Sequence, residues 1–88
     1  MRVTDVKIFQ LKQEKHGLKA FATLTFDESL IISDFRIINT SRGYVVAMPS
    51  KKLSSGAFKE TVFPISTELA EHISTTVIRV FEDEMNLV

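Results

Sequence analysis

The chain has 88 residues, of which 44% are hydrophobic and 25% charged, and its formal net charge is zero. These values are typical of an ordinary globular protein and exclude an intrinsically disordered chain. The absence of Cys excludes disulfides, and no apolar run approaches the ~18 residues of a membrane span or the pattern of a signal peptide. We therefore expect one cytoplasmic domain over residues 1–88 with no membrane association.

Charge is distributed unevenly despite the neutral total. Residues 1–59 carry ten Lys or Arg and five Asp or Glu, whereas residues 60–88 carry one Arg and six acids. The distribution of charge, more than its sum, decides whether a polyanion can dock. A basic body with an acidic tail is therefore compatible with nucleic-acid binding.

The first part of the chain predicts antiparallel strands. Residues 3–11 are rich in β-branched and aromatic side chains without clean alternation, which indicates a strand with a bulge or with both faces partly covered. Charge and a glycine at 12–17 predict a hairpin loop. Residues 18–26 alternate strictly and predict a half-buried strand. A tight connection at 27–29 leads into a further strand at 30–38.

A second hairpin and a basic loop follow. Residues 39–43 contain Asn, Ser and Gly, which favour turns, and residues 44–48 form the predicted return strand. Pro49 should end that strand because proline has no N–H for the ladder. Residues 50–56 are predicted to be a loop, and residues 58–63 a last short strand.

The hydrophobic period lengthens to three and four residues near the C-terminus, which predicts an amphipathic helix over about 67–83. Either Ser66 or Thr67 can cap its start. Acids at 82–84 lie where the helix dipole favours cations, so either the helix frays near Phe81 or these acids meet a basic surface elsewhere. The apolar positions are Leu69, Ala70, Ile73, Val77, Ile78, Phe81 and Met85.

The predicted elements define an α+β fold class. A small antiparallel β-sheet built from hairpins occupies about residues 2–64, and one C-terminal amphipathic helix follows. A core of this size is often reinforced by disulfides, metals or a second copy of the chain. Because Cys is absent, self-association is the remaining reinforcement, and we expect a dimer.

Residues that would support catalysis or metal binding are sparse. His16 and His72 are the only histidines, and neither Cys nor a close acidic cluster accompanies them. Ser50 beside Lys51 suggests a Ser-Lys arrangement, but no other residue supplies a base or an oxyanion hole. We therefore expect no enzyme activity, no metal and no cofactor.

Two charged residues interrupt the predicted strand at 30–38. Asp34 and Arg36 are two positions apart, so on a regular strand they project from one face about 7 Å apart. One interpretation is a recognition or acid-base pair. The favoured one is a structural or dimer ion pair, because a register slip would push both charges into the core.

Lys51 and Lys52 are the leading candidates for nucleic-acid binding. Two lysines on a loop are most often only solvated, but Ser50, Arg42 and Lys59 lie nearby in the sequence. Short hydroxyl donors and flexible cations suit a phosphate backbone without reading bases. We expect these five residues to contact DNA or RNA.

Four segments, taken in order, resemble the SpoVG family, named for stage V sporulation protein G. The resemblance implies a small sheet with a C-terminal helix, assembled as a homodimer that binds DNA or RNA. It also implies effects on septation, sporulation or gene expression in bacteria, with the family's basic pair at Lys51 and Lys52. The segments are "VTDV" at 3–6, "AFATLTFDESLIISDFRII" at 20–38, "GYVVAMPSKK" at 43–52 and "FPI" at 63–65.

The chain departs from this family pattern in two places. Many relatives have histidine where this chain has Phe63, and their helices are commonly less acidic than residues 67–84 here. No role of that histidine is therefore carried over. The alternative function is a non-catalytic adaptor for division or transcription proteins, acting through a sheet edge or the acidic helix.

Overall fold

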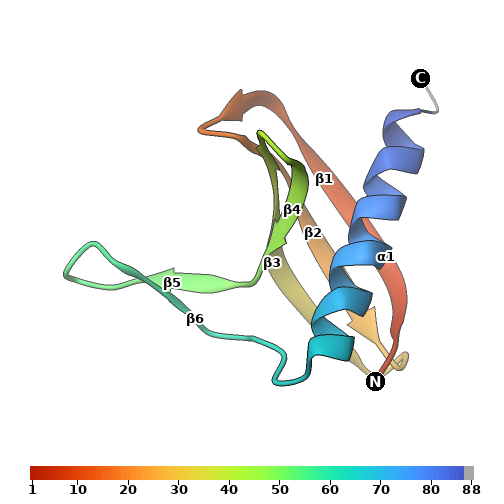
Figure 1. Ribbon diagram of the computed structural model, residues 1–88. Helices are drawn as coiled ribbons and strands as arrows, with labels where there is room; N and C mark the ends of the chain where they lie inside the picture. The colour runs from red at the N-terminus through yellow and green to blue at the C-terminus, as the bar shows by residue number, and fades with distance from the viewer. Residues whose placement is uncertain (87–88) are drawn as a thin grey trace.

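The computed structural model describes residues 1–86 as a four-stranded antiparallel sheet, a separate two-stranded hairpin and one helix (Figure 1). The strand order of the large sheet is β1-β2-β3-β4, and β5 pairs with β6. This arrangement confirms the predicted α+β fold. The elements are β1 (Val3–Lys15), β2 (Leu18–Phe26), β3 (Leu30–Thr40), β4 (Gly43–Ala47), β5 (Ser50–Lys52), β6 (Phe58–Glu60) and α1 (Thr67–Met85).

The hairpin of β1 and β2 is longer than its sequence suggests. β1 continues through residues 12–15, where a loop was predicted, because Lys15 still pairs with Leu18. Two register shifts along β1 confirm the expected irregularity. Gly17 closes the turn with a φ of 84°, and a Cβ there would lie 3.0 Å from the carbonyl oxygen of Asn39. Both its backbone angle and this close approach favour glycine.

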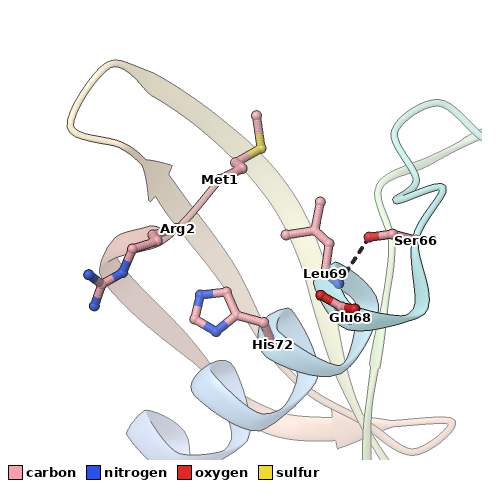
Figure 2. Close-up of a pocket in the computed structure, with 6 residues that line it drawn as sticks. All are labelled: Met1, Arg2, Ser66, Glu68, Leu69 and His72. Atoms are coloured by element: carbon pink, nitrogen blue, oxygen red, sulfur yellow. Dashed lines mark hydrogen bonds between the residues drawn. The ribbon is translucent and has the colours of Figure 1, made fainter.

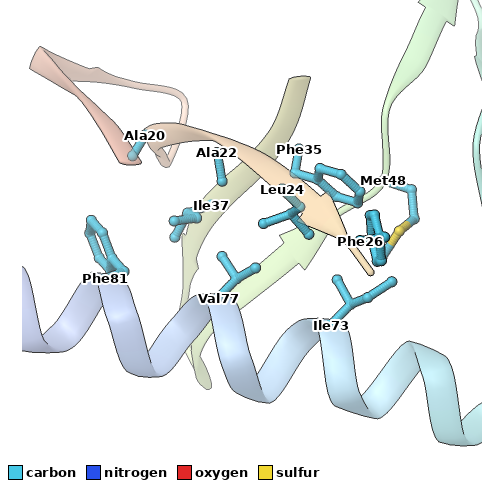
Figure 3. Close-up of a cluster of buried hydrophobic side chains, with 10 residues drawn as sticks. All are labelled: Ala20, Ala22, Leu24, Phe26, Phe35, Ile37, Met48, Ile73, Val77 and Phe81. Carbon is cyan, nitrogen blue, oxygen red and sulfur yellow. The ribbon is translucent and has the colours of Figure 1, made fainter. Parts of the chain in front are cut away.

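The core lies between one face of the sheet and α1 (Figure 3). Every second residue of β2 from Ala20 to Phe26 is buried, as its alternation predicts, and three residues of α1 spaced four apart are buried against the sheet. Successive side chains of a strand point to opposite faces, so α1 covers only one side of the sheet. The buried cluster contains Ala20, Ala22, Leu24, Phe26, Phe35, Ile37, Met48, Ile73, Val77 and Phe81.

α1 begins at a side-chain cap and continues farther than the acidic residues suggested. The Ser66 hydroxyl oxygen accepts a hydrogen bond from the backbone N–H of Leu69 at 3.1 Å. Fraying near Phe81 is wrong, because Tyr44 packs edge-on against the Phe81 ring at 5.0 Å and donates its hydroxyl to the Met85 sulfur. Within residues 1–86 no helix is both long and apolar enough to cross a bilayer.

The segment that leads from the sheet to α1 contains a projecting hairpin, which we call the basic arm (residues 50–60). The predicted loop at 50–56 is wrong in its first half, since Ser50 to Lys52 pair with β6. The backbone N–H of Leu53 donates to the Ala57 carbonyl at 2.7 Å and closes the turn. Figure 1 shows the arm extending away from the large sheet and from α1.

The assigned core predicts different costs for the same truncation at two leucines. Leu24 is 0% exposed and Leu53, at the tip of the arm, is 40% exposed. We expect Leu24→Ala to lower the free energy of unfolding by about 2–5 kcal/mol, because it leaves a cavity in the core. Leu53→Ala should change it by about 0.5 kcal/mol or less. Urea denaturation at matched protein concentration measures both, and equal losses would contradict the assignment.

Candidate nucleic-acid interface

The register of the basic arm decides which of its lysines act together. Lys51 lies directly opposite Lys59, and Lys52 lies opposite Phe58. Neighbouring residues of a strand project to opposite faces, so Lys51 and Lys52 point apart. The structure therefore groups Lys51 with Lys59 on one face of the arm, and we call these two residues the lysine clamp.

The lysine clamp concentrates positive charge at an exposed position. Like charges directly opposite each other destabilise a strand pair, so Lys51 beside Lys59 is unfavourable for the arm itself. Within residues 1–86 neither lysine forms a salt bridge with a carboxylate. The salt bridge that these residues do contain joins Lys19 to Glu14 at 3.0 Å. That contact raises the pKa of Lys19, first through the hydrogen bond that its ammonium group donates to Glu14 and then through the negative charge of Glu14. An anion between the clamp lysines would relieve their repulsion.

A surface cavity of about 570 Å³ adjoins the lysine clamp. Its lining combines two lysines with an aromatic residue, side chains that suit a phosphate and a base. The Thr61 hydroxyl at its edge already donates to the Pro49 carbonyl at 3.3 Å. One carboxylate, Glu60, also lines it and opposes anion binding. The lining residues are Lys51, Leu53, Lys59, Glu60, Thr61 and Phe63.

Arg36 connects the large sheet to the basic arm. Its Nη2 donates to the Ser50 hydroxyl at 3.1 Å and to the Met48 carbonyl at 3.4 Å. These contacts fix the first residue of the arm relative to β3. The sequence did not indicate this role because both partners follow Arg36 by more than ten positions, beyond a strand and a turn. Ser50 thus anchors the start of the arm and is also a candidate phosphate donor.

Asp34 does not join Arg36 in the arrangement expected from a regular strand. Its φ is 71°, and it lies at a register shift between β2 and β3. Within residues 1–86 the two residues form no salt bridge, and Arg36 is directed to the arm instead. The intrachain ion pair is therefore wrong, because the bulge breaks the alternation on which it depended. A dimer contact through these residues stays a prediction.

Arg42 lies apart from the other candidate residues. It occupies the exposed turn between β3 and β4, where its backbone N–H donates to the Thr40 hydroxyl at 3.2 Å. The whole of β4 separates this turn from the arm (Figure 1). The structure therefore brings Lys51, Lys59 and Lys52 together on one hairpin but does not bring Arg42 to them.

A second surface cavity, of about 550 Å³, lies where β1 meets the start of α1 (Figure 2). Two of its polar side chains already have partners in the chain: the His72 Nε2 accepts from the Val3 N–H at 3.1 Å, and Ser66 caps the helix. No group of three potential metal ligands occurs among the described residues. The lining residues are Met1, Arg2, Ser66, Glu68, Leu69 and His72.

The fold and the arm define a class of small α+β protein, in which a helix covers one face of a sheet and a basic hairpin projects from its last strand. The chain belongs to the SpoVG family, whose model matches residues 1–83.

Three relatives illustrate the similarity, and each carries the name "Putative septation protein SpoVG". The one from Macrococcus caseolyticus is 39% identical, over 94% of this chain and 71% of its own length. That from Staphylococcus saprophyticus is 36% identical, over 94% and 81%. That from Phytoplasma australiense is 35% identical, over 98% and 88%.

The contacts of Arg36 predict how firmly the arm is held. Arg36→Ala removes both contacts, whereas Ser50→Ala leaves the donation to the Met48 carbonyl. We expect amide hydrogen exchange in β5 and β6 to become faster in Arg36→Ala, and less so in Ser50→Ala, while exchange in β2 stays unchanged. Mass-spectrometric hydrogen exchange measures this. Equal exchange in the arm of all three proteins would show that Arg36 does not restrain it.

Proposed function

We propose that the protein is a homodimeric cytoplasmic regulator that binds DNA or RNA by its phosphates, with Lys51 and Lys59 as the principal contacts. The observation that carries this proposal is the placement of Lys51 opposite Lys59 on an exposed arm. Lys52, on the other face, contributes charge at longer range. The name of the relatives as septation proteins supports septation as the regulated process. Sporulation and gene expression are the other processes that the family resemblance implies.

Two arms on one dimer make weak contacts effective. A pair of exposed lysines binds a phosphate weakly, but linking two such sites on one body makes the second contact intramolecular. Arg36 contributes by restraining each arm against its sheet. If each of the four clamp lysines in a dimer meets one phosphate, the logarithm of affinity for duplex DNA should fall with the logarithm of salt at a slope of about −3.6.

The acidic helix does not occupy the same side of the molecule as the arm. Figure 1 shows the arm extending away from α1, and the cavity beside the clamp contains no residue of α1. The acids of the helix therefore act on a bound polyanion only through the screened field at longer range. Glu60 is the carboxylate that opposes the proposal most directly.

A mobility-shift assay over a salt series distinguishes binding by the lysine clamp from an effect of the net charge of the protein. Lys51→Ala/Lys59→Ala should abolish the slope of about −3.6, and Lys51→Ala/Lys52→Ala should reduce it to about −1.8, since one clamp lysine per protomer remains. The matched control is Lys12→Ala/Lys15→Ala, which removes the same charge at the exposed end of β1 and should leave the slope unchanged.

The three double variants also define how the proposal fails. Identical slopes in all three would mean that only net charge matters, and a native slope in the clamp variant would exclude the clamp. Light scattering measures the mass of the protein in the same experiment. The expected slope assumes a dimer, whose mass is twice the 10.0 kDa of one chain. A mass of one chain at micromolar concentration would contradict the dimer.

A second candidate function rests on the end of α1. Glu82, Asp83 and Glu84 are exposed on an ordered helical turn that contains no basic residue. Acids are unfavourable at this end of a helix dipole, so their placement favours a role outside the helix. An adaptor that presents these acids to a basic surface of a division or transcription protein is the function that this feature supports.

Charge reversal tests the adaptor separately from nucleic-acid binding. Replacing Glu82, Asp83 and Glu84 by Lys should abolish capture of such a partner, while the mobility shift persists. Cations suit this end of the helix, so lost capture would not result from unfolding. Glu68→Lys/Glu71→Lys, at the other end of α1, is the control and should retain capture. Unchanged capture by the triple variant would exclude the adaptor.

A further inference from the structure

The face of the large sheet that α1 leaves uncovered carries a row of side chains across all four strands. Phe9 pairs with Phe21, Phe21 with Arg36, and Arg36 with Ala47. Their neighbours along each strand, such as Ile8, lie in or against the core, so alternation places this row on the opposite side. Phe9 as a whole residue is 56% exposed. We call the four residues the Phe–Arg row.

The chemistry of the Phe–Arg row matches that of unpaired bases. Two aromatic side chains on neighbouring antiparallel strands, with a helix behind the sheet, provide flat surfaces on which successive bases can stack. The adjoining row pairs Lys7 with Thr23, which adds an ammonium group and a hydroxyl for the backbone. In a duplex the base faces are already stacked, so such a surface selects single strands.

The Phe–Arg row leads directly to the basic arm. Arg36 is a member of the row, and its Nη2 donates to Ser50, the first residue of the arm. A strand whose bases lie on Phe9 and Phe21 therefore reaches the arm lysines by continuing along the row. The acids at the end of α1 lie behind the sheet, because α1 packs on its other face.

A second copy of the chain fits this face less well than a nucleic acid does. Interface cores are depleted of lysine, and burying a cation without a partner is costly. A self-complementary contact over the Phe–Arg row would enclose Lys7 of both copies with the Thr23 hydroxyls, and also Arg36, whose charge has only the neutral partners Ser50 and Met48. A polyanion would instead neutralise these cations.

We propose that this open face is a stacking platform for single-stranded nucleic acid, in which Phe9 and Phe21 each hold one base and the backbone continues onto the basic arm. The inference rests on the proposed function, because it assumes that the arm binds phosphates. Beyond the proposed function, the inference specifies that the ligand is single-stranded and that base stacking, which does not depend on charge, contributes to its binding.

The experiment titrates the full chain with a labelled oligothymidylate of about 12 nucleotides, and with its duplex with oligoadenylate, at several salt concentrations. Phe9→Leu retains apolar bulk and removes the ring, whereas Phe9→Tyr retains the ring. We expect Phe9→Leu to weaken single-strand binding about tenfold at every salt concentration without changing the slope. Phe9→Tyr should bind normally, and duplex binding should change in neither variant.

The clamp variant Lys51→Ala/Lys59→Ala, titrated in parallel, separates the two proposals. If it weakens binding while Phe9→Leu binds like the native chain, the platform is wrong and the phosphate site stands. If it binds normally, the proposed function fails whatever Phe9→Leu does. Equal weakening on duplex and single strand would also overturn the platform, as would a halved mass of Phe9→Leu in light scattering, which would assign the face to a second copy.

Discussion

The burial of one sheet face under α1 is the constraint from which the other features follow. Ile73, Val77 and Phe81 lie against alternate residues of β2 and β3, and this is where the buried apolar cluster lies. A single helix covers one side of a four-stranded sheet, so the second side remains accessible together with the hairpin beyond β4. The same packing places the acidic residues of α1 behind the sheet. The core thus separates a side of the sheet that α1 covers from a side that stays open.

Arg36 holds the arm against the large sheet through its hydrogen bonds to Met48 and Ser50. A two-stranded hairpin is at best marginally stable alone, and the three-residue strands of the arm make no extensive packing contacts with other elements. The contacts from Arg36 to Met48 and Ser50 therefore matter more than two hydrogen bonds usually would. Because Arg36 also belongs to the Phe–Arg row, one guanidinium group fixes the arm and borders the open face.

Sequence reasoning succeeded where the determining interaction was local. The alternation of residues 18–26 predicts the burial of β2, and the stripe from Leu69 to Phe81 predicts the covered face of α1. Sequence reasoning failed where the position of a side chain depends on strand register or on residues distant in the sequence. No local pattern could pair Lys51 with Lys59, since that depends on the turn at Leu53, and the bulge at Asp34 broke the assumed spacing to Arg36. The fold was therefore more predictable than the candidate site.

The neutral total charge of the chain is compatible with a polyanion ligand because the charges are separated in space as well as in sequence. Exposed acids gather on the last turn of α1, and three lysines project on the arm. At physiological salt, exposed charges farther apart than about 8 Å are largely screened from one another. A phosphate at the clamp then responds mainly to Lys51, Lys59 and Glu60, and only weakly to the helix. The acids behind the sheet also disfavour approach from that side, so a nucleic acid bound as proposed would approach the arm and the open face.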